Sequence, residues 1–515
     1  MSISTLNTPC VSEKKRLSNT NILFITPPYE RVGAGYDFLK HITNRSPSLG
    51  LLHLASEIRL HGYQPSIIES DIFGWSVDEV AKNVIQEKPA IVGITLFTIG
   101  VWNASLIARQ IKKALPETLI IVGGPHISSL GKETMSRFPE FDIAVVGEGE
   151  LTLVDLLEAI QQEKPLNAVE GIIYRDHQEI CSTPPRTIQK ILDHLQMPAW
   201  DLLPNFPHAY TPAIYDFPSQ PVATVAASRG CPFHCKFCDT STFGESVRAY
   251  SPKVVFQIMQ HLHQTYGVRH IIFVDDLFLA SKKRTTDLCH LILEHKLPMT
   301  WSCCARVDTV KPDILTLMKK AGCWEISFGL ETGSNELLKK MDKAAEVERS
   351  EKAIQWTADA GIRSKGLFML GYPGEDQQSI QATKDFIRRI PMTIMNLSKF
   401  TPYPGSPIYR ELYHTNMRED HWQKMNGMNF LWAPEGMTIE ELDREYQQML
   451  LSFYRRLKTT WYYTKFSIRH PHHFKRVLRF GVAFAMAKLK SFVKGNKGLL
   501  VDKEAVLLDS QGIIT

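Results

Sequence analysis

Residues 228–239 read Ser-Arg-Gly-Cys-Pro-Phe-His-Cys-Lys-Phe-Cys-Asp and hold three of the nine cysteines of the chain. Cys231, Cys235 and Cys238 have a C-x3-C-x2-C spacing, so one short loop supplies three thiolates. Cysteine thiolates hold iron–sulfur clusters in proteins. Three ligands on a four-iron cluster leave one iron open to another molecule. A structural zinc site built from these cysteines and His234 is the alternative.

The sequence around the cysteines places them at the edge of a sheet. Residues 221–227, Pro-Val-Ala-Thr-Val-Ala-Ala, form an apolar run that predicts a buried strand, and Arg229-Gly230 then allows an abrupt turn. The thiolates would lie just past the C-terminal end of this strand, where barrel enzymes keep their active sites. The motif resembles that of the radical S-adenosylmethionine (SAM) enzymes. This resemblance implies a [4Fe-4S] cluster, with SAM bound at the open iron and cleaved to a 5′-deoxyadenosyl radical.

The composition narrows the class of protein. The chain has 515 residues, of which 44% are hydrophobic and 22% charged, and this fits an enzyme of two or three domains. A net charge of +5 argues against a general nucleic-acid binder. The spacing of the remaining cysteines does not suggest a disulfide framework, so we expect a reduced, cytoplasmic protein. Neither a signal sequence nor an apolar run of about 18 residues is apparent.

Residues 1–20 are polar and basic and predict a flexible tail, and the pattern changes at Asn21. From there to residue 165, short apolar runs alternate with segments of helical periodicity. The runs predict strands at residues 21–29, 64–71, 90–95, 119–122 and 143–146. Such alternation is typical of an α/β protein with an open, mostly parallel, Rossmann-like sheet. Ligands of these sheets bind beyond the strand C-termini, and Gly123-Gly124 would allow a large flat ligand to approach there.

Residues 21–165 resemble the cobalamin-binding domain that precedes many radical SAM barrels. Thr95-Leu96-Phe97 stands where that family has Ser-x-Leu, and Gly123-Gly124 follows after 25 intervening residues. Phe73 occupies the position of the lower axial His, so ligation of cobalt through that loop is not expected. The resemblance implies cobalamin contacts from six residues: Asp71, Thr95, Gly123, Gly124, His126 and Glu148. A degenerate flavodoxin-like domain without a ligand is the alternative.

The middle of the chain is rich in proline, and a second alternating pattern follows it. Six prolines occur between residues 198 and 221, so we place an interdomain linker at residues 166–219. After the cysteines, strands are predicted at residues 270–274, 300–305, 325–329, 364–370 and 394–400. With the strand at 221–227 they make six β/α units over residues 220–410. This number predicts a partial (β/α)6 barrel rather than a closed one of eight.

Polar side chains recur where the barrel strands end. The radical SAM resemblance implies SAM contacts from six residues: Phe237, Asp275, Asp276, Arg306, Glu331 and Gly371. The two aspartates would meet the ammonium group of SAM, and Arg306 could pair with its carboxylate. The alternatives are structural roles, namely helix caps for the aspartates and Glu331, a rim salt bridge for Arg306 and a core position for Phe237.

Residues 411–515 predict a helical C-terminal region rich in aromatic side chains. No acid occurs from Arg469 to Lys497, whereas Lys and Arg flank the apolar run at residues 480–487. A basic amphipathic helix of this kind can lie on an anionic membrane surface, which would place the protein peripherally on the inner face of a membrane. The alternative is a helix packed on the barrel with a solvated basic face.

The two resemblances together predict an oxygen-sensitive enzyme that uses a [4Fe-4S] cluster, SAM and cobalamin to methylate an unactivated carbon. We expect a small-molecule substrate, hydrophobic or lipid-like if the protein meets a membrane, and an electron donor such as flavodoxin or ferredoxin. The first alternative is a radical oxidative cyclase without net methyl transfer, similar to the anaerobic magnesium-protoporphyrin monomethyl ester cyclases. The second is a cobalamin-binding sensor with a structural iron–sulfur site.

Overall fold

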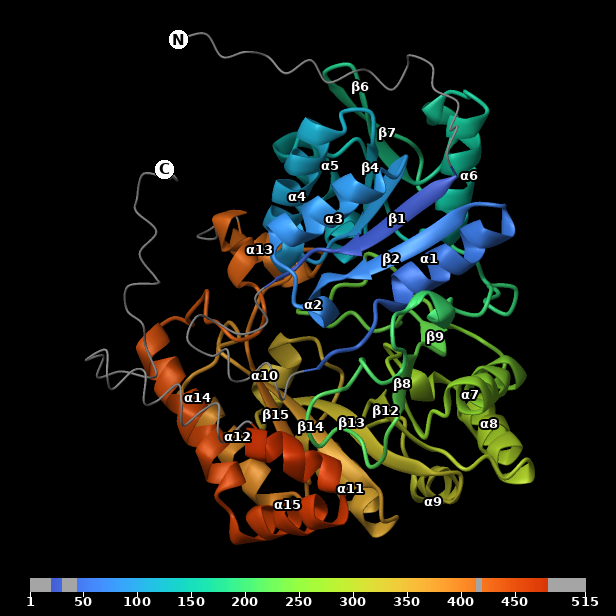
Figure 1. The fold of residues 1–515 in the computed structure, drawn as a ribbon. Helices are drawn as coiled ribbons and strands as arrows, with labels where there is room; N and C mark the ends of the chain where they lie inside the picture. The colour runs from blue at the N-terminus through green and yellow to red at the C-terminus, as the bar shows by residue number, and fades with distance from the viewer. Residues whose placement is uncertain (1–19, 30–43, 414–418, 480–515) are drawn as a thin grey trace.

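Alternating strands and helices build two separate sheets in the computed structural model, which describes residues 20–29, 44–413 and 419–479. The first sheet belongs to the N-terminal part of the chain and the second to the part that carries the cysteines (Figure 1). The C-terminal helices that follow residue 438 pack beside the second sheet. The predicted tail up to residue 19 and the predicted basic segment from residue 480 onward lie outside the described residues.

Seven strands form the first sheet, in the order β2-β1-β3-β4-β5-β6-β7. The first five along the chain pair in parallel, as the sequence predicts. They are β1 (Asn21–Thr26), β2 (Gln64–Glu69), β3 (Ile91–Thr95), β4 (Leu119–Gly123) and β5 (Ile143–Val145). Because these strands run in one direction, the turns predicted to bind a ligand all emerge at the same edge of the sheet.

Helices cover both faces of the first sheet, with α3, α4 and α5 on one face and α1 and α6 on the other (Figure 1). A capping box between Ser76 and Glu79 begins α3. Pro125 begins α5, because its fixed φ suits the first turn of a helix. The helices of this part are α1 (Leu49–Leu60), α2 (Ser70–Phe73), α3 (Val77–Glu87), α4 (Val101–Ala114), α5 (Pro125–Arg137) and α6 (Glu150–Gln161).

The first sheet extends beyond residue 165, into the predicted linker. β6 (Ile172–Asp176) pairs antiparallel with β5, and β7 (Glu179–Ser182) completes a hairpin at the sheet edge. The hairpin gives a weak pattern because its strands are short and only Ile172 and Ile173 are buried. An edge strand needs few apolar residues, since one of its sides has no neighbouring strand.

Six parallel strands form the second sheet, in the order β15-β14-β13-β12-β11-β8. They are β8 (Val222–Val225), β11 (His270–Phe273), β12 (Thr300–Ala305), β13 (Cys323–Glu331), β14 (Arg363–Leu370) and β15 (Ile394–Lys399). β8 and β15 do not pair with each other, so the prediction of a partial (β/α)6 barrel is confirmed. Its helices are α7 (Pro252–Tyr266), α8 (Lys282–Glu294), α9 (Pro312–Lys320), α10 (Asn335–Lys340), α11 (Val347–Asp359) and α12 (Gln377–Arg389).

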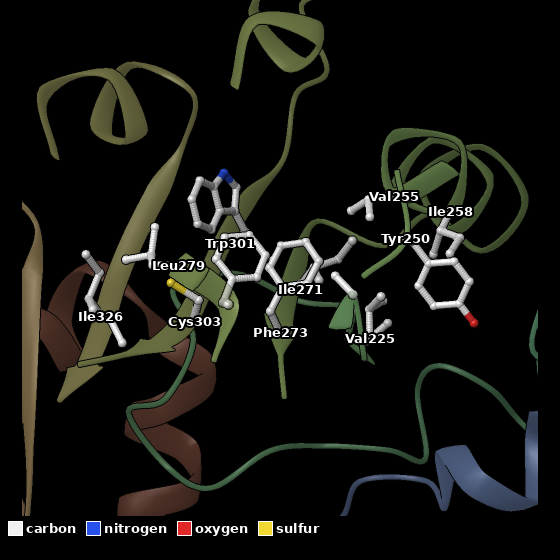
Figure 2. Close-up of a cluster of buried hydrophobic side chains, with 14 of the residues drawn as sticks. Val225, Tyr250, Val255, Ile258, Ile271, Phe273, Leu279, Trp301, Cys303 and Ile326 are labelled. Carbon is white, nitrogen blue, oxygen red and sulfur yellow. The ribbon is translucent and has the colours of Figure 1, made fainter. Parts of the chain in front are cut away.

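An apolar core lies on the outer face of the barrel sheet (Figure 2). Ile271 and Phe273 on β11 lie between Val225 on β8 and Trp301 and Cys303 on β12, and none of these five side chains is more than 3% exposed. Successive side chains of a strand point to opposite faces. The packing of this outer face therefore determines which residues of the same strands point into the barrel.

The C-terminal helices are α13 (Pro407–Tyr413), α14 (Ile439–Tyr454) and α15 (Leu457–Arg469), and helical turns continue over residues 471–479. α14 packs on β15 and α12. The inner face of α15 places Phe466 against Trp324 of the barrel and Tyr215 of the interdomain segment. In the described parts of the chain, no helix is long and apolar enough to cross a bilayer.

Candidate functional site

A cavity of about 740 Å³ lies where the C-terminal edges of the two sheets face each other. This volume is within the usual range of cofactor and small-molecule sites. Residues that the sequence predicts from both halves of the chain line it together: Thr95, Gly123, Gly124, Glu148, Cys231, Cys238 and Asp276. The predicted cobalamin region and the predicted cluster region are thus opposite walls of one cavity.

The paired glycines form the wall contributed by β4. Gly124 has a φ of +103° and a ψ of −175°, a backbone conformation that is essentially restricted to glycine. A Cβ at this position would lie 3.0 Å from the Leu96 carbonyl oxygen and 3.1 Å from the Thr95 hydroxyl oxygen. At Gly123 a Cβ would meet only ordinary contacts with Val145. The sequence therefore presents bare backbone to the cavity, as close approach of a flat ligand requires.

The turn after β2 also borders the cavity but offers no histidine. Asp71 lies in α2, and the next residue, Ile72, lines the cavity. Phe73, at the position of the expected axial His, stacks on Trp75 with ring centroids 4.7 Å apart. Among the described residues of the cavity wall, the single histidine is His53, and burial lowers its pKa to about 4.

His126 does not reach the cavity, which corrects the prediction that it lines the cofactor pocket. Because Pro125 begins α5, His126 lies in the first helical turn and points into the domain, where it is 1% exposed. Its Nδ1 is 3.1 Å from the Thr98 hydroxyl and its Nε2 is 2.9 Å from the Thr134 hydroxyl. Burial lowers the pKa of His126 to about 3, so the ring is neutral and serves the packing of α5.

Glu148 lines the cavity, yet its carboxylate is already paired. Arg248 donates from both Nη atoms to the two oxygens of Glu148, at 3.0 Å for Nη1 to Oε2. Arg248 belongs to β10 (Arg248–Ala249), a short strand of the barrel half. A polar contact from Glu148 to a cofactor would compete with this ion pair between domains.

The cysteine loop leaves β8 through β9 (Ser228–Arg229) and turns at Gly230. Gly230 has a φ of +82°, and a Cβ there would overlap the Ser246 carbonyl oxygen. Its backbone N–H donates to Asp276 Oδ2 over 2.8 Å. Cys231 and Cys238 line the cavity, whereas Cys235 is buried behind them.

The three thiols form a set that suits a cluster. Burial raises the pKa of Cys235, and Lys343 and Arg306 partly oppose this shift. Loss of solvent and the neighbouring thiols Cys235 and Cys231 raise the pKa of Cys238 to about 12. All three thiols come from one loop of eight residues, two of them line the cavity, and a bound metal would deprotonate them outright. The residues present therefore fit an iron–sulfur cluster.

The alternative zinc site would need His234 beside the three thiols. His234 has a side chain that is 65% exposed, and its Nδ1 lies 3.6 Å from Glu245 Oε1. Within residues 20–29, 44–413 and 419–479, no three His, Cys, Asp or Glu side chains converge as ligands of a single metal ion. A tetrahedral zinc site would need four such groups around one point.

Asp275 and Asp276 play different parts, and neither caps a helix. Asp275 is 4% exposed and accepts hydrogen bonds from the Ala227 backbone and the Ser228 hydroxyl. Burial raises its pKa to about 6. Asp276 faces the cavity and accepts from Gly230. Asp275 thus holds the loop before the cysteines, and Asp276 is the carboxylate that a ligand could reach.

The remaining predicted SAM residues, Phe237, Arg306, Glu331 and Gly371, are not among the described residues that line the cavity. Arg306 pairs with Asp308, at 3.1 Å for Nε to Oδ1, and donates to the carbonyl oxygens of Lys343 and Ala344. Its guanidinium carbon is 3.5 Å from the ring centroid of Phe233. Arg306 is only 8% exposed, so the pair with Asp308 is not a rim salt bridge.

Glu331 and Phe237 meet at Lys343, a residue that the sequence analysis did not identify. Lys343 Nζ is 2.6 Å from Glu331 Oε1 and 5.5 Å from the ring centroid of Phe237. Glu331 ends β13, and Ser334 rather than Glu331 caps α10. Nothing in the spacing of the sequence indicates Lys343, because the sheet rather than a motif brings it to the cysteines.

Gly371 begins the turn after β14, and a buried carboxyl group holds it. Its φ is +94°, and its backbone N–H donates to Glu375, which is 2% exposed. Burial raises the pKa of Glu375 to about 8. Glu375 thus shapes the turn at Gly371, one of the residues predicted to contact SAM.

Replacing Glu375 by glutamine is expected to change how stability depends on pH. Burial raises the Glu375 pKa to about 8 from its ordinary value of 4.5, so between these pH values the folded chain keeps a proton that the unfolded chain releases. The free energy of unfolding should therefore fall as pH rises, by up to about 1.4 kcal/mol per pH unit. Glu375→Gln keeps an acceptor for Gly371 and should flatten the profile. Urea unfolding at about pH 5.5 and about pH 7.5 measures the difference, and parallel profiles would contradict this expectation.

Two protein-family models match the chain. The model of the Radical SAM superfamily matches residues 225–387, and the model of the B12 binding domain matches residues 37–157. The first range covers most of the barrel sheet with the cysteine loop, and the second covers the glycine wall of the cavity.

Individual relatives cover most of the chain. It is 30% identical over 440 residues to an uncharacterized methyltransferase of Pyrococcus horikoshii, across 85% of this chain and 93% of the relative. It is 27% identical over 481 residues to the anaerobic magnesium-protoporphyrin IX monomethyl ester cyclase of Rubrivivax gelatinosus, across 92% and 82%. The radical SAM methyltransferase TsrM from Kitasatospora setae, solved with cobalamin and a [4Fe-4S] cluster bound, has the same fold with a TM-score of 0.62 at 17% identity, across 77% of this chain and 75% of that chain.

The fold and the shared cavity define an enzyme in which a radical SAM barrel faces a cobalamin domain. The chain belongs to the family of cobalamin-dependent radical SAM enzymes. SAM, a [4Fe-4S] cluster and cobalamin are the cofactors of this family, so the fold class and the cofactors predicted from the sequence are confirmed.

Proposed function

We propose that the enzyme transfers a methyl group to a carbon atom of a small, largely apolar molecule. The observation that carries this proposal is the single cavity with Gly123 and Gly124 on one wall and Cys231 and Cys238 on the other. When bound, the cluster and SAM supply radical chemistry and cobalamin supplies a methyl carrier. Cys231, Cys235 and Cys238 would hold the cluster, and the glycine wall with Thr95 would hold the cobalamin.

Charged side chains on two sides of the cysteine loop suit the amino acid part of SAM. Lys343 and Arg306 are the cations that act on the Cys235 thiol, and Asp276 is the carboxylate that acts on the Cys238 thiol. An ammonium and a carboxylate on one ligand require an anion and a cation in the site. We assign the ammonium group to Asp276. Because Arg306 is held by Asp308 and two carbonyl groups, its role is to keep a fixed positive charge beside the loop.

Apolar side chains at the cavity support an apolar substrate. Val274 directly follows β11, lines the cavity and is 47% exposed. Phe97 lines it from the first domain and is 49% exposed. Apolar walls of this kind exclude water from reactive intermediates and favour burial of an apolar ligand. We propose flavodoxin or ferredoxin as the electron donor.

Product analysis after anaerobic reconstitution tests the proposal. 5′-Deoxyadenosine together with S-adenosylhomocysteine would support methyl transfer. 5′-Deoxyadenosine alone would favour an oxidative cyclase, a second candidate because the cyclase of Rubrivivax gelatinosus matches 92% of this chain. Neither product would favour a cobalamin-binding sensor.

We also propose that the C-terminal helices rest on an anionic membrane surface. The inner face of α15 is buried through Phe466 and Ser467. A surface helix with a buried inner face ordinarily has a polar outer face. The outer face of α15 instead carries Leu457, Trp461 and Ile468, which are 89%, 61% and 72% exposed.

The turns after α15 repeat this pattern and add positive charge. Phe474 and Leu478 lie one helical turn apart and are 55% and 58% exposed, whereas His473 is buried against Phe217. No Asp or Glu occurs from Tyr446 to Arg479, a stretch that holds eight Lys and Arg residues. Exposed apolar and aromatic side chains with surrounding cations fit a surface of anionic lipid.

A Leu457→Ser, Trp461→Ser double variant is expected to bind phosphatidylglycerol-containing vesicles about tenfold more weakly or worse, because two apolar side chains no longer enter the lipid. Co-sedimentation with vesicles of phosphatidylcholine, with and without phosphatidylglycerol, measures the binding. Leu60→Ser is the matched control, since Leu60 is 62% exposed in the first domain. Equal loss in both variants, or no binding by the unchanged protein, would disprove the membrane contact.

A further inference from the structure

We propose that the first domain positions the iron–sulfur loop, with Glu148 and Glu150 as the positioning residues. This proposal rests on the proposed function only for the presence of the cluster. It goes further by assigning the Gly-Glu-Gly-Glu turn after β5 to the cysteine loop of the other domain rather than to a cofactor.

The N-terminal end of the cysteine loop is held by Arg229, two residues before Cys231. Arg229 Nη2 donates to Glu150 Oε1 over 2.5 Å, and Nη1 lies 3.5 Å from Glu148 Oε1. Arg229 is 5% exposed and Glu150 is 7% exposed. Burial alone would raise the pKa of Glu150, but the Arg229 charge outweighs it and lowers that pKa. Both groups are therefore charged inside the protein, and each depends on the other.

A second arginine joins the same turn to the far end of the loop. Arg248 is paired with Arg229 in the antiparallel ladder between β9 and β10. Besides its forked contact with Glu148, Arg248 donates to the carbonyl oxygens of Gln189 and Phe243. Glu148 thus fixes the strand pair that flanks the cysteines, because a bidentate pair determines orientation as well as distance.

The segment just after the last cysteine also meets the first domain. Asp239 follows Cys238, and its Oδ2 accepts from the Ser129 hydroxyl of α5 over 3.2 Å. Its Oδ1 accepts from the Ser241 backbone over 2.8 Å, and the Ser129 and Ser241 hydroxyl oxygens are 2.9 Å apart. Residues of one domain therefore hold the chain on both sides of the cysteines in the other.

The physical consequence is that the spacing of the thiolates depends on contacts made across the domain boundary. Groups that orient metal ligands from outside the first layer typically change metal affinity by about 10–100-fold when removed. Glu148→Gln keeps the shape of the side chain and removes its charge, which leaves Arg248 buried without its anion. Of the side chains of the first domain that contact the loop, Glu150 and Ser129 then remain.

The experiment compares Glu148→Gln with Asp142→Asn in the full-length protein. Asp142 is the matched control because it forms an equally buried pair with Lys112, at 2.6 Å, at the opposite end of β5. Four measurements are made: iron and sulfide per chain after anaerobic reconstitution, the alkylation rate of each cysteine in the apoprotein, retained cobalamin absorbance, and Tm. For Glu148→Gln we expect cluster affinity about tenfold lower, faster alkylation of Cys231 and Cys238, and unchanged cobalamin. Asp142→Asn should lower Tm without changing the cluster.

Three results would overturn the proposal. Unchanged iron content and alkylation in Glu148→Gln would mean that the pair does not position the loop. Loss of cobalamin with an intact cluster would return Glu148 to the cofactor contact that the sequence analysis assigns. Equal loss of the cluster in Asp142→Asn would show general destabilisation. None of these measurements depends on methyl transfer, so failure of the proposed function would be seen separately.

Discussion

A Cys235→Ser variant is expected to form no 5′-deoxyadenosine above background while keeping its fold. Cys235 is buried, whereas Cys231 and Cys238 line the cavity, and the positive charge of Lys343 acts on the Cys235 thiol. Serine is close to cysteine in size but cannot supply the thiolate that holds an iron–sulfur cluster. We expect 5′-deoxyadenosine formation to fall by at least about 100-fold. The iron content should also fall, because the cluster loses one of its three protein ligands. Liquid chromatography of anaerobic reactions with SAM and dithionite, beside iron analysis, measures both.

Cys181→Ser is the matched control for this variant. Cys181 lies on the edge strand β7 and contributes nothing to the cavity. Its substitution should leave iron content and 5′-deoxyadenosine formation at the level of the unchanged protein. Formation of 5′-deoxyadenosine by Cys235→Ser at that same level would contradict the cluster assignment.

Most of the strands could be predicted from the sequence, because a buried parallel strand leaves a local signal, a short run of apolar residues. The strands at residues 21–26 and 91–95 have mainly apolar interiors and end in a threonine, and the strand at 300–305 is mostly apolar and is followed by Arg306. Parallel strands are covered by helices on both faces, so continuous apolar runs are the expected pattern. Because the strands are parallel, the turns at their C-terminal ends lie at one edge of the sheet, and the position of the cavity follows from this.

The partners of the site residues could not be predicted in the same way. Glu148 and Arg248 are separated by 100 residues, and no local pattern connects them. Lys343 reaches Glu331 only because β13 ends beside α10. His126 was misplaced for a different reason: a loop reading of Gly-Gly-Pro-His overlooks that proline begins a helix and turns the next residue inward.

Polar contacts join the two domains beside the cavity. Arg229 and Asp239 belong to the barrel half by sequence, yet each is bonded to a residue of the first domain. We expect these contacts to fix the distance between the glycine wall and the cysteine loop. A reaction that needs both cofactors at one substrate carbon requires such fixed separation, because misplacement by about 1 Å can cost about 100-fold in rate.

A Gly124→Ala variant is expected to lose most of its cobalamin. The φ of +103° at Gly124 strains any residue with a side chain, at a cost of about 1–3 kcal/mol. The added Cβ would also press on the Leu96 backbone, 3.0 Å from its carbonyl oxygen, so the turn must move away from the position that contacts the ligand. We expect cobalamin affinity to fall by about tenfold or more. Absorbance of cobalamin retained after gel filtration, with Tm measured in parallel, provides the test.

Gly123→Ala separates backbone strain from simple crowding of the ligand. Gly123 has no positive φ, and a Cβ there would lie 3.5 Å from the Val145 carbonyl oxygen, an ordinary contact. This variant should keep a Tm near that of the unchanged protein and retain more cobalamin than Gly124→Ala. If both variants lost cobalamin equally with unchanged Tm, the left-handed turn would not be the reason for glycine at position 124, and the bare backbone of both residues would matter instead.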